Sequence, residues 1–169
     1  MRKLVEHTIR DASRADVFVL VDIIRNSFRD VADRFGLTEK NCPKHPSCCT
    51  THWIEAALQK GVRYFLLEYK GAPCGCVALE LAQPEVCYLE RLAVLPEHRR
   101  HGFGKALVDH ALSAAEAVGA YRVEIGIISA QSELKEWYQH FGFVETGRAV
   151  FKHLPFEVMF MAKGLDVAG

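Results

Sequence analysis

The chain has 169 residues, half of them apolar, and this length predicts one domain that buries roughly 70% of the surface exposed by the unfolded chain. The chain has 21 Lys and Arg residues and 21 Asp and Glu residues. This balance excludes a net positive charge that would attract nucleic acid or an anionic membrane, so any anion-binding site must come from a local cluster. The N-terminus lacks the apolar core of a signal peptide and no run approaches the ~20 apolar residues of a membrane span, so we expect a cytoplasmic protein.

The first half of the chain alternates between helix and strand periods. Ser13 followed by Asp16 is typical of a helix start, and Gly36 stands where that helix should end. Thr50 or Thr51 can cap a second helix, and the short segment 71–73 between two apolar runs indicates a hairpin. The expected elements are a strand over 5–12, helices over 17–35 and 52–61, and strands over 62–70, 74–82 and 86–95.

The second half continues this alternation. A glycine turn at 99–104 leads into an amphipathic helix that stops at Gly119, and Pro155 lies between the last two strands. The further expected elements are a strand over 121–127, a helix over 129–142, and strands over 143–154 and 156–164. This order predicts a single α/β domain over residues 1–169, with a mixed sheet covered by helices on both faces.

The stretch Arg99–Leu107, RRHGFGKAL, indicates an anion site. Main-chain N–H groups at the start of a helix have no intrahelical acceptors and lie at the positive end of the helix dipole, which suits phosphate. A nucleotide-hydrolase loop is excluded, because Gly104-Lys105 is followed by Ala106 rather than Ser or Thr. A dinucleotide-binding fingerprint is excluded by the late position of the turn. The alternative is an ordinary β–α turn with a solvated charged rim.

In its context, this turn resembles the signature [RQ]-x-x-G-x-[GA] of the GNAT superfamily of acyl-CoA N-acyltransferases. The segment 136–147, EWYQHFGFVETG, resembles the second signature of that family. The resemblance implies a central twisted mixed sheet of about seven strands with helices on both faces, and acetyl-CoA as cosubstrate in a gap between the fourth and fifth strands. The residues that it implies for cofactor binding are Leu92, Ala93, Val94, Arg99, Arg100, His101, Gly102, Phe103, Gly104 and Lys105. Gln131 departs from the Asn that is common in the family.

Acetyl transfer requires a neutral amine, whereas an alkylammonium has a pKa of about 10.4. The resemblance implies Glu90 as the base that removes the proton, directly or through water. Even spacing from Leu92 and Val94 predicts that the Glu90 side chain shares their face of the strand. The alternative is an exposed glutamate paired with Arg91 or Arg63.

Tyr138 occupies the family's tyrosine position, which implies that it donates a proton to the leaving thiolate. The alternative is a core tyrosine whose hydroxyl bonds to the backbone. The resemblance also implies that the N–H of Val94 stabilises the oxyanion. Nothing next to Cys87 indicates an activated nucleophile, so direct attack by the amine in a ternary complex is expected.

Cys42, His45, Cys48, Cys49 and His52 lie within one Pro-interrupted stretch. Their spacing is irregular and lacks the second half of a zinc motif, so we predict no metal site. A role in binding the acceptor or as a lid is the favoured interpretation, and an ordered loop is the alternative.

The sequence therefore predicts an N-acetyltransferase that acetylates a small-molecule amine or an amino-terminal acceptor, without nucleic acid or membrane partners. A homodimer is possible, with the apolar final strand 156–161 as its exposed edge. Two other classes stay open: a non-catalytic acyl-CoA-binding sensor of the same fold, and a zinc-stapled interaction module.

Overall fold

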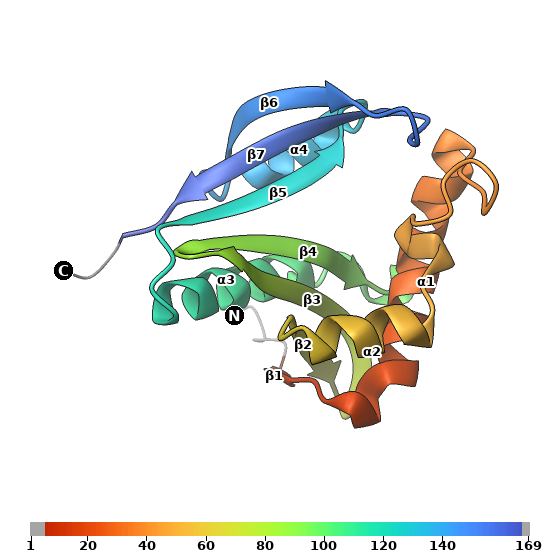
Figure 1. Ribbon diagram of the computed structural model, residues 1–169. Coiled ribbons are helices and arrows are strands. Elements are labelled where there is room, and N and C mark those ends of the chain that lie inside the picture. Colours follow the sequence, from red (N-terminus) through yellow and green to blue (C-terminus); the bar gives the residue numbers. More distant parts are fainter. Residues whose placement is uncertain (1–5, 167–169) are drawn as a thin grey trace.

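The computed structural model describes residues 6–166, which form one seven-stranded sheet with the strand order β1-β2-β3-β4-β5-β7-β6 (Figure 1). The strands are β1 (His7–Asp11), β2 (Arg63–Tyr69), β3 (Ala72–Gln83), β4 (Val86–Val94), β5 (Arg122–Ile128), β6 (Val144–Val150) and β7 (Glu157–Gly164). The helices are α1 (Val17–Phe35), α2 (Thr51–Gln59), α3 (Phe103–Ala117) and α4 (Ser132–Gln139), with short 3-10 turns η1 (Arg14–Asp16), η2 (Pro46–Cys48) and η3 (Pro96–His98).

Helices cover both faces of this sheet, as predicted. On one face Leu20 and Ile24 of α1 and Ile54 of α2 pack against β2 and β3. On the other face Leu107 of α3 and Tyr138 of α4 share a core cluster with the opposite sides of the same strands. The β4–β5 pair is parallel and its neighbours are antiparallel, which confirms the mixed sheet.

Local turn chemistry sets several of the predicted boundaries. Gly36 ends α1 with a φ of 62°, and Thr50 caps α2 by accepting from the N–H of Trp53. Lys70 and Gly71, with φ values of 51° and 76°, form the tight turn of the β2–β3 hairpin. The predicted first strand begins at residue 5, which lies outside the described residues. None of the described helices is both long and apolar enough to cross a bilayer.

The prediction that the final strand forms an exposed edge is wrong. β7 lies between β5 and β6 and pairs with both, so its main-chain groups are used within the sheet. The edge strands are β1 and β6, and β6 precedes β7 in the chain. The last strand of the chain is not at the edge of the sheet, because it is inserted between β5 and β6.

β4 and β5 separate along their length, and this separation shapes the molecule (Figure 1). They pair only from Val86 with Arg122 to Tyr88 with Glu124. Beyond this point β4 stays with β3, while β5 stays with β7. Among the described strands, none therefore pairs with the side of β4 that faces β5 beyond Tyr88.

The end of α1 bridges the two separated strands. Ala32 packs with Ile128 at the end of β5 and with Phe156 just before β7. An ion pair joins Arg34 of α1 to Glu133 of α4. The gap between β4 and β5 is therefore closed by α1 at its wide end.

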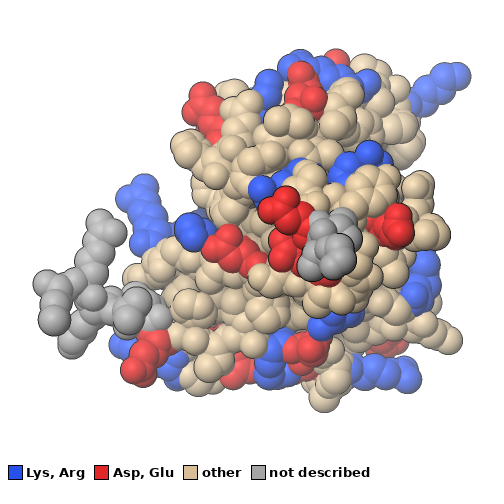
Figure 2. Space-filling model, turned by 90° about the vertical axis from the view of Figure 1, so that its left-hand side faces the viewer, with Lys and Arg blue, Asp and Glu red and all other residues tan. Residues whose placement is uncertain are grey.

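The surface carries both signs of charge. On the face shown in Figure 2, Lys and Arg side chains are interspersed with Asp and Glu side chains, and neither sign covers the face. This agrees with the equal totals in the sequence, 21 basic and 21 acidic residues. For this face, recognition by a broad charged surface is not indicated.

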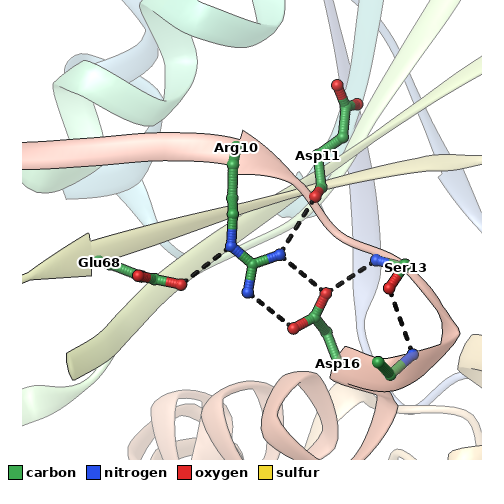
Figure 3. Close-up of polar contacts among 6 residues, drawn as sticks. Arg10, Asp11, Ser13, Asp16 and Glu68 are labelled. Atoms are coloured by element: carbon green, nitrogen blue, oxygen red, sulfur yellow. Dashed lines mark hydrogen bonds and ion pairs between the residues drawn. The ribbon is translucent and has the colours of Figure 1, made fainter. Parts of the chain in front are cut away.

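The start of α1 is held by the Arg10 guanidinium, which binds the carboxylate of Asp16 with two hydrogen bonds of 2.8 and 2.9 Å (Figure 3). Asp16 also accepts from the N–H of Ser13 at 2.8 Å, and the Ser13 hydroxyl accepts from the N–H of Ala15, completing the predicted capping box. Arg10 further binds Glu68 of β2 at 3.0 Å. These contacts fix the angle at which the chain enters α1.

We expect Asp16→Asn to lower the free energy of unfolding by about 1–2 kcal/mol, because the ion pair of the buried Asp16 with the exposed Arg10 and the helix cap both weaken. Hydrogen bonds from Arg10 lower the pKa of Asp16 from its usual value of 3.8 to about 2. A carboxyl with a lowered folded-state pKa stabilises the fold above pH 3.8 and loses this effect as pH falls toward 2. Urea unfolding at pH 7 and pH 2.5 measures both effects. Asp33→Asn, at an exposed position of α1, is the matched control; equal losses in the two variants contradict the prediction.

Candidate active site

Two neighbouring cavities lie beside the part of β4 that has separated from β5. The first, here called the strand cavity, has a volume of about 410 Å³ and lies between the ends of β4 and β5. The second, the loop cavity, has a volume of about 510 Å³ and lies beside the turn that begins α3. Residues that line both are Phe28, Val31, Leu92, Gln131 and Leu134. Such volumes are typical of sites for small molecules.

The turn before α3 presents uncapped main-chain N–H groups to the loop cavity. Arg100 and Gly102 have left-handed φ values of 68° and 78°, and none of the side chains between residues 6 and 166 caps the helix. The first N–H bonded in the helical pattern is that of Ala106, which donates to the carbonyl of Gly102. The amides of Phe103, Gly104 and Lys105 are therefore free to bind an anion, as the sequence predicts.

The side-chain charges of this turn are largely used within the protein. Arg99 donates to Asp30 and to the carbonyl of Ser27 at 2.8 Å each, and to the carbonyl of Val94 at 3.3 Å. Lys105 forms an ion pair with Asp109 at 2.8 Å. Arg100 lacks an ion pair within residues 6–166. Arg99 thus ties α1 to the end of β4 instead of standing free at the rim.

Main-chain groups at the end of β4 also face the gap. The N–H of Leu95 donates to the carbonyl of Cys74 at 2.9 Å, so Leu95 and Cys74 form a hydrogen-bonded pair. In antiparallel sheets such pairs alternate with non-bonded ones, and the neighbouring pair is Val94 with Gly75. The N–H of Val94 therefore points away from β3, into the gap beside β5.

A bulge in β4 changes the direction of its side chains. Glu90 pairs with Ala78 and Ala93 with Cys76, so one extra residue of β4 lies between these pairs. Arg91 takes up the bulge with a φ of 53°. The prediction that Glu90 shares a face with Leu92 is wrong, because the bulge inverts the alternation: Ala78, opposite Glu90, lies in the α1–α2 core, whereas Leu92 packs against the α3 core.

Glu90 is half-buried and lines the strand cavity. Burial and the neighbouring carboxyl of Glu80 raise its pKa, while Arg91 and Lys60 partly oppose this. The alternative of an exposed ion pair is wrong: within the described chain Glu90 pairs with neither arginine, and Arg63 binds Asp11 at 3.1 Å. A carboxyl with a raised pKa inside a cavity is a candidate proton acceptor.

Tyr138 is buried in α4 and lines the same cavity. Its ring packs against Trp137 and Phe143, with ring centroids 5.0 and 5.5 Å away. Burial raises its pKa. Across residues 6–166 its hydroxyl makes no hydrogen bond, so the predicted alternative, a hydroxyl bonded to the backbone, is not found.

The Cys- and His-rich segment contributes His45, which is buried and lines the strand cavity. Burial, with a smaller effect from Arg91, lowers its pKa to about 4, so the imidazole is neutral at pH 7. No three His, Cys, Asp or Glu side chains between residues 6 and 166 are grouped so that they could hold a metal ion. The structure thus places two residues of this segment, His45 and Pro46, in the wall of the strand cavity.

The Acetyltransferase (GNAT) family profile matches residues 25–143. This chain belongs to that family. N-acetyltransferase family 8 member 3 of Mus musculus is 31% identical over 96 residues, which cover 54% of this chain and 42% of the mouse protein. This GNAT chain therefore spans less than half of that relative's length.

Solved structures share the GNAT fold. The ribosomal-protein-S18-alanine N-acetyltransferase of Escherichia coli has a TM-score of 0.74 at 17% identity, covering 97% of each chain. The putative acetyltransferase yncA of Salmonella typhimurium, solved with its cofactor acetyl-CoA, has a TM-score of 0.71 at 20% identity, covering 95% of this chain and 94% of that one. These likenesses confirm the predicted fold.

Several residues of this GNAT site were not predicted. Phe28 and Val31 of α1 line both cavities, and their only signal was membership of the apolar stripe of that helix. Trp137 packs against Gly104, where a Cβ would lie 3.4 Å from its ring. No sequence pattern predicted Arg91 as a residue of the cavity, because its position depends on the bulge in β4.

We expect Glu80→Gln to lower the pKa of Glu90, since it removes a neighbouring negative charge and frees Lys60, which binds Glu80 at 4.0 Å. The pKa should still exceed the usual 4.5, because burial is the largest cause of the shift. Carboxyl ¹³C NMR titration of Glu90 measures this. Glu116→Gln, at an exposed position of α3, should leave the Glu90 titration unchanged; an unmoved titration in Glu80→Gln as well refutes the coupling.

Proposed function

We propose that this chain is a single GNAT domain that transfers the acetyl group of acetyl-CoA to the primary amine of a small molecule or an amino-terminal acceptor. The observation that supports this proposal is that free main-chain N–H donors from two elements lie near one another. The uncapped amides at the start of α3 and the N–H of Val94 both lie at the gap between β4 and β5.

The residues of the loop cavity fit a diphosphate followed by an extended amide-containing arm. Hydrogen bonds to a charged partner contribute roughly 1.5–3 kcal/mol each, so three amides outweigh the ~0.3–1 kcal/mol of the helix dipole. In this proposal the main chain of Arg100 to Lys105 holds the diphosphate. The unpaired edge of β4, from Leu92 to Val94, receives the arm. Arg99 acts by fixing α1 to β4, since its guanidinium is already bonded.

The strand cavity supports the chemistry of the amine. Glu90, or a water held by it, takes a proton from the ammonium, and its raised pKa brings it closer to that of the amine. The neutral nitrogen forms a bond to the thioester carbonyl carbon, whose oxygen accepts from the N–H of Val94. The carbon–sulfur bond breaks, and Tyr138 donates its proton to the departing thiolate. The second proton, which the attacking nitrogen loses as the amide forms, returns the phenolate of Tyr138 to the phenol through water. Cys87 is buried, with its pKa raised by burial, which supports direct attack without an acyl-enzyme.

Gly104→Asp should weaken the binding of CoA by about 100-fold, because a carboxylate at the helix start competes for the amides and repels the diphosphate. The same carboxylate stabilises the helix through its dipole, so thermal stability should be unchanged or slightly higher. Isothermal calorimetry and thermal unfolding separate these effects. Gly104→Ala is the matched control, since its Cβ meets Trp137 at an acceptable 3.4 Å. If the wild-type protein releases no heat with CoA or acetyl-CoA, the proposed function fails.

Glu90→Gln should lower kcat by 10²- to 10⁴-fold, the usual contribution of a general base, with the Kd for CoA unchanged. Tyr138→Phe should lower kcat without changing the pKa of the acidic limb, because Glu90 still titrates. Thiol release from acetyl-CoA with a panel of primary amines measures turnover, and Glu116→Gln is the control. Full activity in Glu90→Gln contradicts the assigned base. CoA binding without transfer to any amine favours the non-catalytic sensor.

A further inference from the structure

Arg91 is a half-buried cation of the strand cavity. Within residues 6–166 its guanidinium forms no ion pair and no hydrogen bond, and its observed contact is with the ring of Trp53, 5.5 Å from the centroid. It is also the only Lys or Arg among the described residues that line this cavity. Five N–H donors of a planar fork are therefore available at the cavity wall.

The bulge brings Arg91 and Glu90 to the same cavity. In a regular strand, adjacent side chains point to opposite faces. Here both residues line the strand cavity, and both are close enough to Tyr64 to influence its pKa. Their Cα atoms are about 3.8 Å apart, as for any adjacent residues. One carboxyl and one guanidinium thus line the same cavity, and within residues 6–166 they form no ion pair with each other.

His45 adds a neutral donor to this wall. Its Nδ1 accepts from the N–H of Ser47 at 3.3 Å and lies 2.7 Å from the Ser47 hydroxyl. With Nδ1 accepting, the neutral ring carries its proton on Nε2. The cavity therefore offers one positive charge, one neutral N–H donor and one carboxyl. The remaining lining side chains are mostly apolar, including Phe28, Val31 and Phe156.

We propose that the acceptor is a free amino acid with an apolar side chain, whose carboxylate binds Arg91 while its amine lies beside Glu90. This inference rests on the proposed acetyl transfer and names the substrate class of that same site. A guanidinium binds a carboxylate with two parallel hydrogen bonds, and a single cation matches a single negative charge. Because Arg91 and Glu90 are adjacent and line one cavity, an acceptor whose carboxylate and amine are a few bonds apart can reach both, which favours an α-amino acid. The apolar walls favour an apolar side chain.

The decisive comparison is between an amino acid and its amide. Phenylalanine, leucine and methionine are each compared with phenylalaninamide, leucinamide and methioninamide, which keep the amine and side chain but lack the negative charge. We expect kcat/KM of the wild-type protein to favour at least one acid over its amide on the order of 10- to 100-fold. Arg91→Gln should abolish this preference, whereas Arg29→Gln, which removes an exposed cation from the outside of α1, should keep it.

Two further measurements test the inference even if Arg91→Gln folds poorly. Arg91→Lys keeps the charge but loses the fork, and it should retain part of the preference for the acid. Amides that react as well as acids in the wild-type protein overturn the inference without any variant. The inference is also overturned if CoA binds and other primary amines are acetylated, but none of these acids is. Absence of CoA binding instead overturns the proposed function itself, so the two failures are distinguishable.

Discussion

The early end of pairing between β4 and β5 is the constraint on which the rest of the structure depends. The strands pair from Val86 to Tyr88 of β4 and then separate, so on the β5 side the following main-chain groups of β4 pair with none of the described strands. Main-chain groups removed from water need partners, and an unpaired strand edge inside a protein is therefore a place for a ligand that supplies them. Both cavities lie along this edge, and the amides at the start of α3 lie at its end.

The two cavities differ in how they generate a local field. The loop cavity relies on main-chain dipoles, because Arg99 and Lys105 are already paired with Asp30 and Asp109. The strand cavity relies on side chains: the carboxyl of Glu90 is raised in pKa by burial and by Glu80. In such a partly buried site, charges interact more strongly than in water, so Glu90 and Arg91 can select a ligand in a protein with no net charge.

α1 is the element that fixes the positions of the walls of both cavities. Its start is fixed by the Arg10–Asp16 pair, its middle by Arg99, and its end by the cluster around Ile128. Each contact reaches a different part of the sheet: β1, the end of β4, and the end of β5. Because Phe28 and Val31 lie between these fixed points, the walls that they form keep a defined position relative to both strands.

The sequence by itself determined the mixed sheet, the helices on both faces, the hairpin at Gly71 and the glycine turn at 99–104, because these follow from local periodicity, caps and turn residues. Tertiary structure alone decided three things: the insertion of β7 between β5 and β6, the bulge at Arg91 and the pairing of Arg99 with α1. An extra residue in β4 reverses the alternation after Glu90, and no local pattern reveals it. Strand order and strand bulges depend on which segments meet in space, and a one-dimensional pattern does not carry that information.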